Sequence, residues 1–106
     1  INGGFNVYPA EVEHLMSDHP GIARVAVVGV PDQRLGEVGA AFVVAASDAG
    51  PEAGPDPDEV VAWCRTTMAN YKVPRLVVVV DELPMNASGK VLKFKLRDRA
   101  TALRNG

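Results

Sequence analysis

Two valine-rich segments joined by a short turn set the topology of this chain. Residues 23–30 and 38–46 read as β-strands, and residues 32–36 between them form a turn. Five residues are too few for the crossover that parallel strands need, so the two strands are expected to pair antiparallel. Residues 75–80 form a third strand, and its unbroken aliphatic run predicts burial on both faces.

Helices are expected before and after the strand segments along the chain. The first spans residues 9–18, where Pro9 suits an opening helical turn and apolar residues recur at helical spacing. The second begins after Asp56, because an aspartate before Pro57 with Glu59 three positions on is typical of a helix N-cap. Its buried side is expected to hold Val60, Val61, Cys64 and Met68.

The last helix is basic and follows Lys90. Its apolar positions recur at helical spacing and are Leu92, Leu96, Ala100 and Leu103. Residues 47–57 are rich in Gly, Pro and Asp, which predicts a surface loop. With 106 residues the chain fits one domain. The sequence therefore predicts a small α+β domain: about three strands with a central antiparallel pair, packed by about three helices, and a functional loop before the C-terminal helix.

Charge is unevenly distributed along the chain. Lys and Arg number 11 against 13 Asp and Glu, a net charge of −2, so no nucleic-acid partner is expected. Residues 1–84 carry 5 basic and 12 acidic side chains, whereas residues 85–106 carry 6 basic and 1 acidic. The C-terminal segment is where an anion would be drawn, although on charge alone a solvated basic helix face is the simpler explanation.

Cysteine and histidine usage exclude several kinds of site. Cys64 is the single cysteine, so no internal disulfide or cysteine-based metal site can form, and a reducing, cytoplasmic setting is expected. Its apolar neighbours predict a core position rather than a nucleophile. His14 and His19 lack partners at metal-ligand spacing, so no metal site is expected. No apolar run approaches the roughly 20 residues of a membrane span.

The segment 83–93 places one lysine on a loop before the basic helix. Its Pro, Asn, Ser and Gly residues disfavour a regular element, so Lys90 is expected at a loop tip. Gly89 before Lys90 suggests a phosphate loop, but Pro84 stands at the first-glycine position and Val91 at the hydroxyl position. What is left is either an ordinary surface lysine or a single cation that reaches an anion presented from elsewhere.

Four blocks in order along the chain carry a family resemblance. They are GGFNVYPAEVE at 3–13, VVGVPD with GE at 27–37, YKVP at 71–74, and LP with SGK at 83–90. Together they resemble the C-terminal domain of the adenylate-forming acyl-CoA synthetases, the AMP-binding superfamily that includes the fatty-acid–CoA ligases. The resemblance covers essentially the whole chain. It implies that residues 1–106 are the lid domain of a longer ligase, and the abrupt start within a glycine loop agrees with this.

The family's reaction has two steps, and the resemblance implies the same here. A fatty or other carboxylic acid reacts with ATP and magnesium to give an acyl-adenylate and pyrophosphate, and the acyl group then passes to the thiol of CoA. The N-terminal domain, which is absent from this chain, would hold ATP, Mg2+ and the acid. This domain would swivel as a lid over that site, so it is expected to be inactive alone.

The resemblance also implies roles for particular residues. Lys90 matches the lysine that enters the site during adenylation, where an ammonium between the carboxylate and the nucleotide relieves their repulsion. Its loop would be supported by Pro84, Ser88 and Gly89. The path of the CoA thiol arm would be flanked by Gly3, Gly4 and Phe5, where missing Cβ atoms allow a close approach.

Two alternatives remain open from the sequence. The chain also resembles the matching subdomain of a nonribosomal peptide synthetase, which delivers its acyl group to a carrier-protein thiol. The amino-acid sequence of residues 4–9, GFNVYP, favours the CoA ligases. It could also be a stand-alone binding or regulatory homologue without catalysis. Fatty acyl, aryl and sterol-derived acids all remain candidate substrates.

Overall fold

The predicted order of helices and strands is confirmed. The computed structural model describes residues 8–34, 36–46 and 54–105. The helices are α1 (Pro9–Met16), α2 (Pro57–Thr67) and α3 (Lys93–Asn105), with a short 3-10 helix at Asn70–Lys72. The strands are β1 (Ile22–Asp32), β2 (Gly36–Ala45) and β3 (Leu76–Val80). These elements form an α+β domain.

The three strands form one mixed sheet in the order β1-β2-β3. β1 and β2 pair antiparallel, with Val30 opposite Val38, as the short turn predicts. β3 pairs parallel with β2, with Phe42 opposite Val78. The parallel pairing is possible because the connection from β2 to β3 carries α2 and is long enough to cross over.

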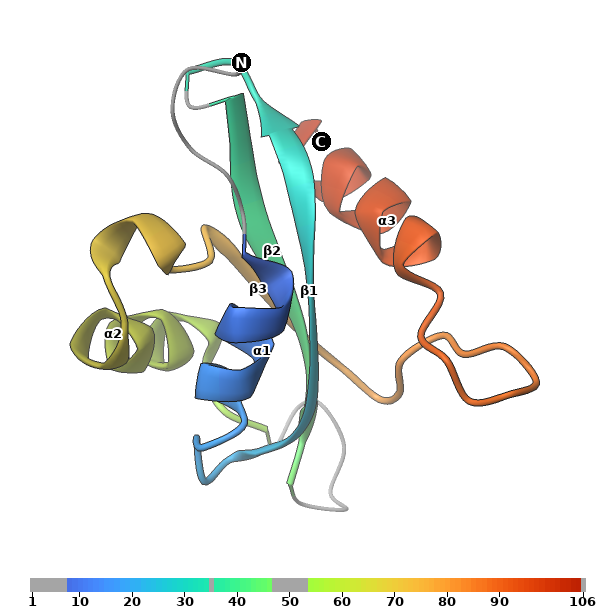
Figure 1. Cartoon of the computed structure of the whole chain (residues 1–106). Helices are drawn as coiled ribbons and strands as arrows, with labels where there is room; N and C mark the ends of the chain where they lie inside the picture. The colour runs from blue at the N-terminus through green and yellow to red at the C-terminus, as the bar shows by residue number, and fades with distance from the viewer. Residues whose placement is uncertain (1–7, 35, 47–53, 106) are drawn as a thin grey trace.

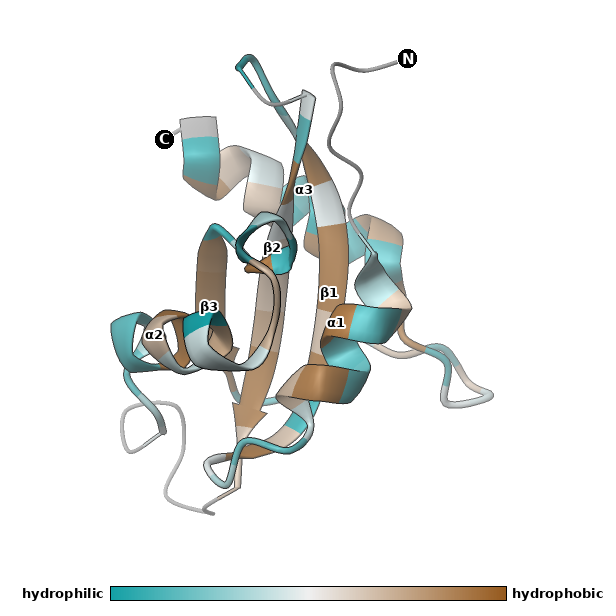
Figure 2. Cartoon of the chain, turned by 60° about the vertical axis from the view of Figure 1, so that its left-hand side comes forward, coloured by the Kyte–Doolittle hydropathy of each residue, from teal (hydrophilic) through white to brown (hydrophobic). Residues whose placement is uncertain are grey.

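The sheet is sandwiched between two helical layers, with α1 and α2 on one face and α3 on the other (Figure 1). Side chains alternate along each strand, so Val27 packs with the α1 and α2 cluster while Ala26 and Val28 pack with the α3 cluster. Figure 2 shows the three strands as a largely hydrophobic layer between the helices. The domain therefore has two small cores, one on each side of the sheet.

Strand β3 is covered on both faces, as its aliphatic run predicts. Val77 lies in the cluster beneath α1 and α2, and Val80 lies in the cluster beneath α3. Leu76, Val78 and Val79 are partly buried against the same two clusters. Polar residues do not alternate with apolar ones along β3, because side chains on both faces of the strand pack against a hydrophobic cluster.

Cys64 fills the core on the α2 side of the sheet. The residue is fully buried. Burial raises the pKa of its thiol to about 11, and the nearby Glu59 carboxylate adds a smaller contribution. The thiol is therefore neutral at physiological pH, as expected of a structural cysteine. None of the helices in the described ranges is long and apolar enough to cross a membrane.

The end of α1 is tied to the start of α2 by His19. The helix ends at Met16, two residues earlier than predicted. His19 is 5% exposed, its Nδ1 accepts a hydrogen bond from the Gly21 N–H at 2.9 Å, and its Nε2 lies 3.1 Å from the Glu59 carboxylate. Asp56 caps α2 as predicted, accepting from the Asp58 N–H at 3.0 Å. The buried histidine thus has a structural partner 40 positions away.

Candidate functional site

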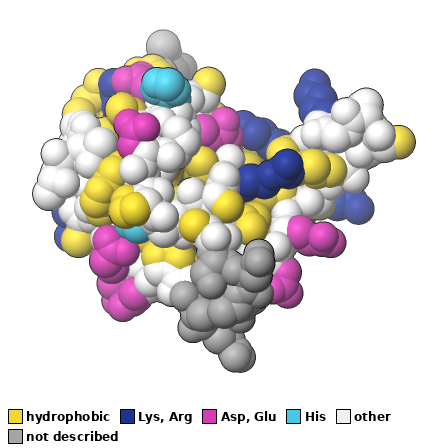
Figure 3. Space-filling model, turned by 90° about the horizontal axis from the view of Figure 1, so that it is seen from below, with side chains coloured by type: hydrophobic (Ala, Val, Ile, Leu, Met, Phe, Trp, Pro, Cys, Tyr) yellow, Lys and Arg dark blue, Asp and Glu magenta, His cyan; other side chains and the backbone are white. Residues whose placement is uncertain are grey.

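The loop between β3 and α3 projects from the body of the domain (Figures 1 and 3). Its two arms form a narrow hairpin, with an isolated antiparallel bridge between Met85 and Val91. The Leu92 N–H donates to the Pro84 carbonyl at 2.8 Å, and the Asn86 N–H donates to the Lys90 carbonyl at 2.9 Å. Lys90 lies on this hairpin, as the sequence predicts, but the arms are paired rather than irregular.

Asn86 organises the tip of the hairpin. Its side-chain Oδ1 accepts three hydrogen bonds: from the Ser88 N–H at 3.0 Å, the Ser88 hydroxyl at 2.8 Å and the Lys90 N–H at 3.0 Å. Its carbonyl also accepts from the Gly89 N–H at 3.0 Å. Gly89 has φ +85°, a backbone conformation that side chains disfavour, so glycine is required there. Of the predicted supporting residues, Ser88 and Gly89 are both part of this turn.

The ammonium of Lys90 is exposed and has no hydrogen-bond or ion-pair partner within the described part of the chain. Lys72 and Lys93 differ in this respect, since they pair with Glu11 at 2.6 Å and Glu13 at 2.7 Å. The hydrogen bond to Glu11 raises the pKa of Lys72. Lys90 is therefore a cation held by its backbone, with its charge available to a ligand from outside the domain.

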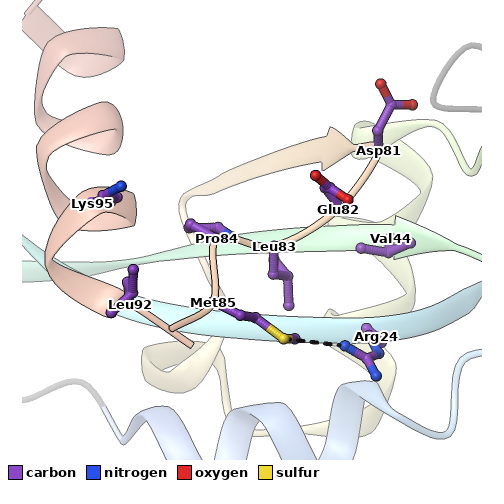
Figure 4. Close-up of a pocket in the computed structure, with 9 residues that line it drawn as sticks. All are labelled: Arg24, Val44, Asp81, Glu82, Leu83, Pro84, Met85, Leu92 and Lys95. Atoms are coloured by element: carbon purple, nitrogen blue, oxygen red, sulfur yellow. Dashed lines mark hydrogen bonds between the residues drawn. The ribbon is translucent and has the colours of Figure 1, made fainter. Parts of the chain in front are cut away.

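The base of the hairpin is anchored beside a hollow of about 610 Å³ between the sheet and α3. Figure 4 shows Leu83 and Met85 pointing from the chain toward the strands, with Lys95 contributed by α3. Leu83 is buried in the α3 cluster, and an Arg24 guanidinium N–H donates to the Met85 sulfur at 3.6 Å. Pro84 stands between these two anchors. The hairpin thus emerges from a fixed base.

Of the six cations in residues 85–106, three have partners among the described residues. Lys93 pairs with Glu13, Arg104 pairs with Asp32, and the Arg99 guanidinium lies 5.8 Å from the centre of the Phe42 ring. The excess charge of the C-terminal segment therefore serves partly to dock α3 on the sheet. Leu103, predicted on the apolar side of this helix, is 49% exposed, whereas Leu96 and Ala100 are buried.

Glu13 joins three elements next to the hairpin. Its Oε2 lies 2.7 Å from the Lys93 ammonium at the first residue of α3, and it accepts the Val27 N–H of β1 at 2.7 Å. β1 is an edge strand, and this bond gives the Val27 N–H a partner outside the sheet. The first turn of α3, which begins three residues after Lys90, is thereby fixed to α1 and β1.

The remaining predicted site residues, Gly3, Gly4 and Phe5, lie outside the described residues. Among the residues that are described, no group of three or more His, Cys, Asp or Glu side chains could hold a metal ion. The hairpin with Lys90 is thus the part of the candidate site that the structure places.

Comparison with known proteins decides the family. The family described as AMP-binding enzyme C-terminal domain matches residues 11–90, which include the hairpin up to Lys90. The chain belongs to this family.

Two of the curated relatives of this chain are a CoA ligase and a CoA synthase. A methyl-dioxo-octahydro-indenyl-propanoyl:CoA ligase of Rhodococcus jostii is 55% identical over 98 residues, covering 92% of this chain and 18% of that protein. A feruloyl-CoA synthase of an Amycolatopsis species is 50% identical over 99 residues, covering 93% of this chain and 19% of that protein. The chain thus spans about a fifth of the length of the curated relatives it matches.

Solved structures agree with this assignment. A fatty acyl CoA synthetase of Mycobacterium tuberculosis superposes with a TM-score of 0.80 at 41% sequence identity. The match covers 97% of this chain and 20% of that one. The resemblance of the four sequence blocks to acyl-CoA synthetases is therefore confirmed, as is the α+β fold that it implies.

Proposed function

We propose that this chain is the C-terminal lid domain of an ATP-dependent, AMP-forming ligase that joins a carboxylic acid to CoA, and that Lys90 supplies the cation for adenylation. The observation that carries the proposal is the exposed, unpartnered ammonium on a hydrogen-bonded hairpin. The names of the relatives, all acyl-CoA ligases or synthases among those above, favour CoA over a carrier protein as the acceptor.

The first half-reaction needs a positive charge. The carboxylate of the acid attacks the α-phosphate of ATP, forming the acyl–phosphate bond and releasing pyrophosphate. Two anions must approach each other, and an ammonium placed between them stabilises the charge that develops on the phosphate oxygens. A lysine already paired with a carboxylate, as Lys72 and Lys93 are, would have to break that pair first. Lys90 has no such cost.

The rest of the active site belongs, in this proposal, to the part of the protein that precedes Ile1. The Mg2+ that would neutralise the triphosphate is assigned to that part, together with ATP and the acid. The buried, neutral thiol of Cys64 is compatible with the reducing cytoplasm in which we place the enzyme.

The isolated 106-residue domain is expected to show no ATP–pyrophosphate exchange, because one cation alone cannot assemble the adenylation site. The test is an exchange assay with a panel of long-chain fatty, aryl and polycyclic acids, run on the domain and on the full-length protein. Exchange with at least one acid is expected from the full-length protein only. Robust exchange by the isolated domain would contradict the lid function.

Gly3, Gly4 and Phe5 are proposed to flank the path of the CoA thiol during the second half-reaction. Gly4→Trp in the full-length protein is then expected to slow acyl transfer to CoA more than adenylate formation, because an indole ring would obstruct a thin thiol arm. The two steps are timed separately, from ATP plus acid and from preformed acyl-AMP plus CoA. An equal loss in both would remove this loop from the CoA path.

A further inference from the structure

We propose that Asn86 is a positioning residue for Lys90, and that its side-chain oxygen sets the orientation of the hairpin tip that adenylation requires. This inference rests on the proposed function of Lys90. Asn86 itself touches neither reactant: it acts on Lys90 through the backbone N–H of that residue, which donates to Asn86 Oδ1 at 3.0 Å.

A single oxygen holds most of the tip. Asn86 Oδ1 accepts from two backbone N–H groups and one hydroxyl, all within 3.0 Å, and these donors span the whole segment from Ser88 to Lys90. Two backbone bonds, between the Asn86 N–H and the Lys90 carbonyl and between the Gly89 N–H and the Asn86 carbonyl, close the turn around it. The direction of the Lys90 Cα–Cβ bond therefore depends on where this oxygen lies.

Packing does not hold the tip. Asn86, Ala87, Ser88, Gly89 and Lys90 are all exposed, whereas Leu83 at the base of the hairpin is 7% exposed. The far arm is fixed where α3 begins, through the pair of Lys93 with Glu13. Both ends of the hairpin are thus anchored to the domain, and the conformation of the tip between them is left to the hydrogen bonds of Asn86.

Because the hairpin tip is exposed, loss of the Asn86 side chain should affect the position of Lys90 without affecting the folding of the domain. Without the Asn86 oxygen, the Ser88 and Lys90 N–H groups would donate to water at little cost to the stability of the domain, because they already lie at the surface. The Lys90 ammonium would instead sample more orientations. A displacement of about 1 Å from the productive geometry lowers a rate by as much as a hundredfold, so the loss should appear in the chemical step rather than in thermal stability.

The experiment uses the full-length protein with Asn86→Ala, Asn86→Asp and Asn86→Ser. Aspartate keeps the shape and position of the acceptor oxygen, and serine keeps a neutral acceptor. Asn70→Ala makes the same chemical change at another exposed asparagine. Single-turnover adenylate formation, acyl transfer from preformed acyl-AMP, and melting temperature are measured for each variant.

Asn86→Ala is expected to slow single-turnover adenylate formation by about ten- to a hundredfold at saturating ATP, and the ATP concentration that gives half the maximal rate should change little. Acyl transfer should stay within about twofold of the parent, and the melting temperature within about 3 °C. At least one of Asn86→Asp and Asn86→Ser should recover most of the lost rate, and Asn70→Ala should match the parent. The inference is overturned if Asn86→Ala adenylates normally, or if neither acceptor-bearing variant recovers the rate.

A double variant separates this inference from the function it rests on. If Asn86 acts only through Lys90, Asn86→Ala combined with Lys90→Ala should adenylate within about twofold of Lys90→Ala alone. An additional loss in the double variant would show that Asn86 acts independently of Lys90. If Lys90→Ala adenylates at the parent rate, both the proposed function of Lys90 and this inference are wrong. If Lys90→Ala adenylates slowly but Asn86→Ala adenylates at the parent rate, only this inference is wrong.

Discussion

Lys90→Ala in the full-length protein is expected, under the proposed function, to slow acyl-adenylate formation by about a hundredfold or more, the scale for removing one preorganised donor that stabilises developing charge. Adenylation brings a carboxylate against a triphosphate, and Lys90 is an exposed cation without a partner in the described structure. Transfer of the acyl group to CoA should be largely spared, because the proposed swivel of the lid takes Lys90 away from the adenylate before the thiol attacks. The measurement is a pair of single-turnover experiments, one from ATP plus acid and one from preformed acyl-AMP plus CoA.

Lys95→Ala is the matched control for this experiment. Lys95 is exposed, lies five residues from Lys90 and lines the hollow at the base of the same hairpin. It should stay within a few-fold of the parent in both steps. Lys93 is less suitable, because its pair with Glu13 anchors α3 and its loss would disturb the base of the hairpin. Normal adenylation by Lys90→Ala, or an equal loss in both steps, would show that the proposed mechanism is wrong.

Much of the fold could be predicted because its determinants are local. The short turn at 32–36 allows only an antiparallel pair, and Asp56 begins α2 through a hydrogen bond to a residue two positions away. The parallel pairing of β3 with β2 is different. It brings Phe42 opposite Val78, 36 positions apart, and no pattern within either strand specifies its neighbour. Strand order therefore depends on how the whole domain packs, and it cannot be read from one segment.

The candidate site also has features that could be predicted from local sequence and features that could not. The exposure of Lys90 could be predicted from the turn-forming residues around it. The pairing of Lys93 with Glu13 could not, because it joins residues 80 positions apart that meet only when α1 and α3 pack on β1. Asn86 was missed for another reason. An asparagine two residues before a serine is a recognisable turn signal, but its third hydrogen bond, to Lys90, depends on the left-handed conformation of Gly89.

Phe42→Ala is expected to lower the free energy of unfolding of the domain by about 3–5 kcal/mol, the usual cost of truncating a buried phenylalanine. Phe42 is fully buried in the central strand, where it belongs to the cluster that docks α3 and its ring lies beneath Arg99. Domains of this size are stable by about 5–15 kcal/mol, so the loss is a large share of the total. Urea unfolding followed by circular dichroism measures it.

Phe94→Ala provides the control for this prediction, since it makes the same chemical change at the start of α3 but on a side chain that is 56% exposed. Its effect should stay within about 0.5 kcal/mol, as for surface substitutions elsewhere. The comparison tests directly whether α3 covers its face of the sheet, because only a sheet covered by α3 buries Phe42 and leaves Phe94 in solvent. If the two variants lose similar stability, or Phe94→Ala loses more, then α3 packs on the sheet through a different face and the base of the Lys90 hairpin is not where the structure places it.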